Sequence, residues 1–300
     1  ANLHGVFLSG TPGPIRVVGE KGLFLSTEDG EDWTIGSVAC DGQECSLDQS
    51  ITNLDGLTAG DLYSVRFKDS INGLIVGQGA RVLTTNDGGE SFTMLTPVTI
   101  ESGSAPTLWN IAMDDLGNLA VSGSSGIVFK VEPETTDASD EVTFQWYGCR
   151  KSGGCSIEIP APLEDMSRTD GDLYASSLVE DTIFVGGQAG YVAKHFSGAW
   201  TTLPQIGDGS DDVTGMYWST PQTAVIITKN GKIMHTEDGG ASFTAVDLPE
   251  GSFSFSAISG RNAGDISAGP RTPTSGFWLL MMPAVLACAL VSAILEPMVA

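Results

Sequence analysis

The sequence has few basic residues for its size. It carries 14 Lys and Arg against 37 Asp and Glu, which gives a formal net charge of −23 at pH 7. Binding to nucleic acid and adsorption to anionic lipid both need basic patches, so this balance argues against both partners. We interpret the acidity as a solvated surface that keeps the protein soluble; a docking face for a basic partner is the alternative.

Residues that bind metals and cofactors are also scarce. The three His residues have no metal-ligand spacing, and the acidic clusters at 114–115 and 208–212 lack the alternating oxygen ligands of a calcium loop. Every glycine cluster joins two expected strands, whereas a phosphate-binding loop joins a strand to a helix. The sequence also has no haem-attachment motif. We therefore expect no metal and no cofactor.

A short phrase built around an Asp-Gly pair recurs along the chain. Its three copies read TEDGEDW, TNDGGESF and TEDGGASF, with the pairs Asp29-Gly30, Asp87-Gly88 and Asp238-Gly239. The Asp side chain can accept hydrogen bonds from nearby N–H groups, and Gly supplies positive φ, so each copy predicts a tight turn between strands. The Trp or Phe that ends the phrase is expected to open the next strand and pack inward. The copies are spaced by about 50 residues or a multiple of that, which indicates a solenoid or a propeller.

Each full repeat reads as four short strands with tight turns, which is one propeller blade. Five complete repeats can be traced, and a sixth begins near residue 253 and stops after about two strands. We predict an all-β fold, a β-propeller of five to six blades over residues 1–270. Insertions near 37–60 and 131–172 are long for blade connections, and we expect them to be contact surfaces.

These motifs resemble the bacterial neuraminidase repeat, or Asp-box, family over roughly residues 3–270. Within that family, the sequence is most similar to the photosystem II assembly and stability factor group. The Asp-box is specific for a hairpin in a propeller and not for a function. The resemblance implies a rigid propeller that is held at a membrane complex and recognises protein surfaces.

Sialidases of the same superfamily provide the enzymatic alternative. The resemblance to sialidases would imply an active site with three Arg residues that hold the carboxylate of the substrate, a Tyr–Glu nucleophile pair and an Asp that acts as the general acid. In this sequence Arg16 follows Pro14 and Ile15, which does not match the Arg-Ile-Pro order of sialidases. Tyr63, Tyr174 and Tyr217 fall on the first strands of their repeats, where core or channel packing explains them. We therefore expect no catalysis.

Four of the five cysteines fall in pairs within the two insertions. The pairs are Cys40 with Cys45, and Cys149 with Cys155. A zinc site would need nearby His or Cys-x-x-Cys spacing, and neither is present. The spacing predicts two local disulfides, although four Cys residues allow three pairings. Disulfides indicate an oxidising space such as a periplasm, a lumen or the cell exterior.

The C-terminal part of the chain is strongly apolar. Residues 276–295 carry no charge, and their number suffices for a helix to cross about 30 Å of hydrocarbon. We predict a transmembrane helix there, with a linker at 271–275, a stub at 296–300 and the C-terminus in the cytoplasm. Small residues at four-residue steps predict packing against partner helices: Ala284, Cys288 and Ser292. A buried core helix, a removable anchor signal and a lone anchor are the alternatives.

Together these features predict a non-catalytic accessory, assembly or stabilising subunit of a membrane complex. Integral membrane subunits would be its partners, and the resemblance implies a photosynthetic complex. A singly anchored cell-surface adhesion propeller is the second hypothesis, and a membrane-tethered glycan hydrolase is the third. Purification in mild detergent separates the first two, because only an assembly subunit brings integral subunits with it.

Overall fold

The computed structural model contains β-strands and short 3-10 turns in the parts of the chain that it describes. These parts are residues 2–8, 14–42, 44–50, 59–95, 106–114, 117–135, 142–147, 171–197, 199–248, 255–260, 266–270 and 279–281. The chain divides into two compact units, Ala1–Leu173 and Tyr174–Ala300. Across the described ranges, no helix combines the length and the apolar character that a bilayer crossing needs. The all-β prediction is confirmed for these residues.

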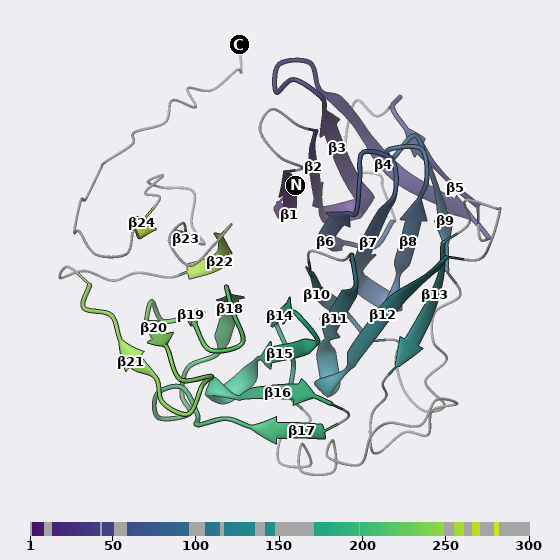
Figure 1. Ribbon diagram of the computed structural model, residues 1–300. Helices are drawn as coiled ribbons and strands as arrows, with labels where there is room; N and C mark the ends of the chain where they lie inside the picture. The colour runs from purple at the N-terminus through teal and green to yellow at the C-terminus, as the bar shows by residue number, and fades with distance from the viewer. Residues whose placement is uncertain are drawn as a thin grey trace. The chain divides into compact units, whose positions relative to one another are not determined.

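The described residues of the first unit form three antiparallel blades and one additional strand (Figure 1). Blade 1 comprises β1 (Leu3–Leu8), β2 (Ile15–Gly19), β3 (Leu23–Thr27) and β4 (Thr34–Asp41). Blade 2 comprises β6 (Leu62–Phe67), β7 (Gly73–Gly77), β8 (Val82–Thr85) and β9 (Ser91–Met94). Blade 3 comprises β10 (Leu108–Met113), β11 (Leu119–Gly123), β12 (Val128–Thr135) and β13 (Val142–Tyr147).

The described residues of the second unit form three further antiparallel sheets, blades 4 to 6. Blade 4 comprises β14 (Ala175–Val179), β15 (Thr182–Gly186), β16 (Val192–Phe196) and β17 (Ala199–Thr202). Blade 5 comprises β18 (Val213–Trp218), β19 (Ala224–Thr228), β20 (Ile233–Thr236) and β21 (Thr244–Ala245). Blade 6 comprises β22 (Phe255–Gly260), β23 (Ile266–Pro270) and β24 (Leu279–Met281).

The second strand is deeply buried in blades 2 to 5. Every residue of β7, β11, β15 and β19 is buried. Short continuous apolar runs such as GLIVG are typical of strands that are covered on both faces. The resulting cores lie between neighbouring blades, since Phe24 of blade 1 packs in one cluster with Val65 and Ile75 of blade 2. The fold is therefore stabilised mainly where one blade meets the next.

A 3-10 turn joins the second and third strands in four blades: η1 (Glu20–Gly22), η2 (Gln78–Ala80), η3 (Ser124–Gly126) and η5 (Gln188–Gly190). Lys21 and Ala189 take positive φ, at 58° and 59°, in which a side chain is strained. A carboxylate from the start of the next blade holds each of them: Lys21 N donates to Asp61 Oδ1 at 2.9 Å, and Ala189 N donates to Asp212 Oδ1 at 3.1 Å. These bonds fix the turns against the first strands.

Strand β5 (Glu44–Asp48) joins blades 1 and 2 into one nine-stranded sheet. It pairs antiparallel with β4 on one side and with β9 on the other (Figure 1). The described start of the 37–60 insertion is therefore paired sheet rather than a free loop. In the same way, β13 lies within the 131–172 insertion and supplies the fourth strand of blade 3. The backbone N–H and C=O groups of β5 and β13 have hydrogen-bond partners in neighbouring strands, and the sequence pattern alone did not reveal these partners.

Cys40 and Cys45 form a disulfide across β4 and β5, as predicted. Cys45 is 5% exposed and packs in the core that blades 1 and 2 share. The bond therefore links the bridging strand β5 to blade 1 next to this core. Cys149 and Cys155 lie outside the described residues, so the second disulfide stays a prediction.

Removing this disulfide should lower the stability of the protein. The double variant Cys40→Ser/Cys45→Ala is expected to lose about 2 kcal/mol of unfolding free energy, because the short closed loop no longer restricts the unfolded chain. Urea unfolding measures the loss, and the wild-type protein under a reducing agent is the control, with a similar decrease expected. Equal midpoints for the wild type and the double variant would contradict the prediction.

The C-terminal segment differs from its prediction. Leu279–Met281 form β24, which pairs with β23 in the register Ile266↔Met281. The helix predicted over 276–295 is therefore wrong at these three residues, because a short apolar run here pairs with the backbone groups of β23 as the third strand of a blade. The rest of 276–295 lies outside the described residues, as do the predicted linker and stub and the helix-packing residues Ala284, Cys288 and Ser292.

Candidate functional site

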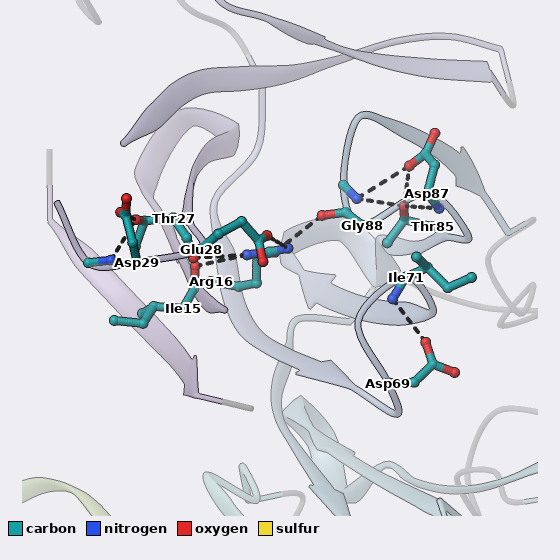
Figure 2. Close-up of polar contacts among 12 residues, drawn as sticks. Ile15, Arg16, Thr27, Glu28, Asp29, Asp69, Ile71, Thr85, Asp87 and Gly88 are labelled. Atoms are coloured by element: carbon teal, nitrogen blue, oxygen red, sulfur yellow. Dashed lines mark hydrogen bonds and ion pairs between the residues drawn. The ribbon is translucent and has the colours of Figure 1, made fainter. Parts of the chain in front are cut away.

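The predicted Asp-box turns connect the third and fourth strands of their blades. In the second copy, Asp87 Oδ1 accepts a hydrogen bond from Thr85 Oγ1 at 2.7 Å, drawn in Figure 2, and another from Ser91 N at 3.0 Å. The copy at Asp238 has both contacts at the same two distances. In the first copy, Asp29 Oδ1 accepts the N–H groups of the two residues that follow Gly30. The Asp-box carboxylates are thus used to close turns.

These hydrogen bonds keep the Asp-box carboxylates ionised. Burial raises the pKa of Asp87, but hydrogen bonds from Ser91 and Thr85 outweigh it and hold the pKa below its ordinary value. For Asp238, the Ser242 hydroxyl and N–H lower the pKa most. The hydrogen bonds to these ionised carboxylates stabilise the folded protein. Because the pKa of each carboxyl is lower in the folded state than in the unfolded state, this stabilisation is present above about pH 4 and is lost as the pH falls through the folded-state pKa.

The aromatic residue that ends each Asp-box does not pack inward in every copy. Phe92 is 3% exposed and meets the Phe24 ring edge-on, with centroids 5.2 Å apart. Phe243 packs against the core between blades 4 and 5. Trp33 is 40% exposed, so the inward-packing prediction is wrong for it. The Asp-boxes of blades 2 and 5 lie against the preceding blade of the same unit. Trp33 belongs to the Asp-box of blade 1, which is the first blade of its unit.

A cationic side chain of one blade holds the Asp-box of the next. Arg16 on β2 is 4% exposed; its Nε donates to Gly88 O at 3.2 Å, and its Nη2 lies 2.7 Å from Glu28 Oε1 (Figure 2). In the second unit, Lys194 Nζ donates to Gly239 O at 3.0 Å. Gly88 and Gly239 are equivalent positions in the two boxes. The repeated contact therefore has a structural role between blades.

Three aromatic rings stand in a row along the first strands of blades 1 to 3. The ring centroid of His4 on β1 lies 4.8 Å from that of Tyr63 on β6, which lies 4.6 Å from that of Trp109 on β10. Each of them is the second residue of its strand. His4 is exposed, and the other two are half-buried. We call these three residues the aromatic row; it is a candidate binding surface because ring faces and edges stack on ligand groups.

Two carboxylates border the aromatic row. Asp61 directly precedes β6, and the Tyr63 hydroxyl lies 3.5 Å from Asp61 Oδ2. Glu20 accepts hydrogen bonds from Asn2 N at 2.9 Å and from Asn2 Nδ2 at 2.6 Å, and these bonds lower its pKa. Burial, with the charges of Asp61 and Glu20, raises the pKa of Tyr63. Tyr63 therefore keeps its phenolic proton at neutral pH.

The acidic loop at 208–212 is occupied by structural hydrogen bonds. Asp211 is fully buried; it accepts Thr228 Oγ1 at 2.6 Å and Asn230 N at 3.0 Å. In blade 3, Asp114 accepts the backbone and side-chain N–H groups of Asn118. Within the part of the chain that the structure describes, no cluster of three or more His, Cys, Asp or Glu residues could hold a metal ion.

Sequence reasoning did not find the aromatic row. It assigned Tyr63 to packing and His4 to a scattered surface position, and it did not single out Trp109 or Asp61. A usable signal existed, because each ring follows a Leu at the start of the first strand of its repeat. Aligning the repeats on that Leu would have placed the three rings at one structural position.

Comparison with known proteins identifies the fold. No protein-family model and no curated protein matches the sequence. Among solved structures, YCF48 from Cyanidioschyzon merolae matches with a TM-score of 0.54 and 15% identity over 94% of this chain and 95% of that chain. Virginiamycin B lyase from Staphylococcus aureus matches with a TM-score of 0.60 and 11% identity, covering 94% and 85%. A streptogramin B lyase matches with a TM-score of 0.58 and 10% identity, covering 94% and 83%.

These likenesses show a β-propeller fold. YCF48 is a photosystem II assembly factor, so the resemblance to that group is confirmed at the level of fold. The lyases are enzymes on the same fold. A fold alone does not select between such functions, so the function has to be inferred from the residues of the site.

Proposed function

We propose that this chain is a non-catalytic propeller subunit that assists the assembly, or supports the stability, of a membrane protein complex. The aromatic row is the observation that carries the proposal. Its three rings come from three separate strands, and aromatic residues are enriched where proteins bind one another. The likeness in fold to the photosystem II assembly factor group favours a photosynthetic complex as the partner.

Two features support a non-catalytic role. A sialidase needs Arg side chains that are free to hold a substrate carboxylate, but Arg16 is buried and bonded to Gly88 and Glu28. A Tyr nucleophile needs activation, whereas the surroundings of Tyr63 raise its pKa. Tyr63 is thus suited to contact with a partner rather than to attack on a substrate.

We also propose that the propeller lies on the periplasmic, lumenal or extracellular side of its membrane. The disulfide between Cys40 and Cys45 supports this location, because disulfides persist in oxidising compartments and are rare in the cytosol. A partner complex would then present its exoplasmic surface to the aromatic row.

Purification of the tagged chain from its native membrane in a mild detergent tests the proposed function. We expect integral membrane subunits to co-purify in stoichiometric amounts with the wild type and to be lost from the Tyr63→Leu/Trp109→Leu variant. Trp33→Leu removes an exposed ring outside the aromatic row and should leave co-purification unchanged. Recovery of the wild-type chain without any integral subunit would overturn the proposal.

A further inference from the structure

The chemistry around the aromatic row indicates what a partner would have to present. The ring planes of His4 and Tyr63 are inclined by 38°, and those of Tyr63 and Trp109 by 59°. The rings are thus tilted against one another rather than stacked flat. The carboxylate of Asp61 lies next to the central ring, with Oδ2 3.5 Å from the Tyr63 hydroxyl oxygen.

The charges around the row are defined by short hydrogen bonds. Glu20 accepts two hydrogen bonds from Asn2, and these bonds lower its pKa. Two basic residues adjoin this region: Lys21 follows Glu20 in η1, and Arg81 donates to Gly60 O at 3.2 Å. Cations and carboxylates thus both lie near the row, and the formal charge of −23 gives the whole molecule a field that attracts cationic ligands.

We propose that the aromatic row receives the Lys or Arg side chains of an extended, basic segment of a protein partner. A cation over the face of Tyr63 or Trp109 is attracted by the ring quadrupole, and the Asp61 carboxylate adds a charge partner at the central ring. An acidic segment would be repelled by the net charge of the protein. This inference rests on the proposed function and names the chemistry of the partner at that surface.

A peptide titration tests the inference. The probe is a short Gly-Ser peptide that contains several Lys residues, compared with the same peptide in which every Lys is replaced by Gln. Binding is followed by tryptophan fluorescence and by calorimetry, at low and at physiological ionic strength. We expect the Lys peptide to bind at least about tenfold more tightly than the Gln peptide, with an affinity that falls as salt is added.

Three variants separate the aromatic row from the rest of the surface. Tyr63→Leu removes the central ring and should weaken binding of the Lys peptide by about tenfold. Tyr63→Phe keeps the ring and loses only the hydroxyl, so it should bind like the wild type. Trp33→Leu should also bind like the wild type, and the thermal unfolding midpoint of each variant confirms that it is folded.

Three results would overturn the inference: equal affinity for the Lys and Gln peptides, unchanged affinity in a folded Tyr63→Leu variant, or binding of a neutral oligosaccharide in place of the peptide. The outcomes of the two experiments are distinguishable. Co-purification of integral subunits without peptide binding rejects a basic segment and leaves the proposed function standing. If the chain binds the Lys peptide but co-purifies with no integral membrane subunit, the proposed function is rejected and the inference of a basic segment is left standing.

Discussion

Replacing Gly89 with alanine is expected to lower the unfolding free energy by about 2–4 kcal/mol. Gly89 has φ of +101°, and a Cβ there would lie 2.6 Å from Cζ of Phe24 on the preceding blade. Phe24 is fully buried in the core between blades 1 and 2, so its ring has no open space into which to move. The substitution therefore combines backbone strain with overpacking of a closed core.

Gly30→Ala is the matched control for this effect. Gly30 also belongs to an Asp-box and has φ of +83°, but nothing lies within 4 Å of the place that a Cβ would take there. Its loss should be about 1 kcal/mol, from backbone strain alone. Urea unfolding of both variants measures the difference in unfolding free energy. The double variant Gly89→Ala/Phe24→Leu should lose less unfolding free energy than the sum of the two single losses, because the smaller side chain at position 24 relieves the contact. Equal losses for the two glycine variants would show that the contact between blades does not matter.

Replacing Arg16 with methionine is expected to cost about 2–4 kcal/mol. Methionine fills a similar volume, but it cannot donate to Gly88 O and Thr27 O, which Arg16 bonds at 3.2 Å and 3.3 Å. The guanidinium also lies over the Phe67 ring, 5.4 Å from its centroid. Two carbonyl acceptors would lose a charged donor at a place where one blade meets the next.

The carboxylate partner of Arg16 provides the control. The Glu28 side chain is 72% exposed, so its ion pair with Arg16 should contribute less than about 1 kcal/mol. Glu28→Gln should accordingly unfold close to the wild type in the same denaturant series. If Glu28→Gln were as destabilised as Arg16→Met, the ion pair rather than the contact with the next Asp-box would be the source of stability.

The parts of the fold that follow local chemistry could be predicted from the sequence. The Asp-box turns depend on side chains that bond the backbone within four residues, so Asp87 and Asp238 could be assigned without knowledge of the fold. The disulfide of Cys40 and Cys45 is equally local. Both features rest on contacts that form within a single hairpin.

Long-range partners could not be predicted in the same way. Strand β5 looks like part of a loop until β9 is known to lie beside it, and Leu279–Met281 fit an apolar helix until β23 offers them backbone partners. The aromatic row escaped notice because its equivalent positions carry three different side chains: His4, Tyr63 and Trp109. In each case the deciding contact joins segments that are far apart in the sequence.

The bridge that β5 makes has a consequence for behaviour at high concentration. The last strand of a blade leaves a row of backbone donors and acceptors unpaired, and such a rim invites another molecule to add its own strand. In blades 1 and 2 these two rims, at β4 and β9, are covered by the same inserted strand. The N-terminal part of the protein is thereby protected against self-association through strand addition, and the disulfide at Cys40 fastens the protecting strand in place.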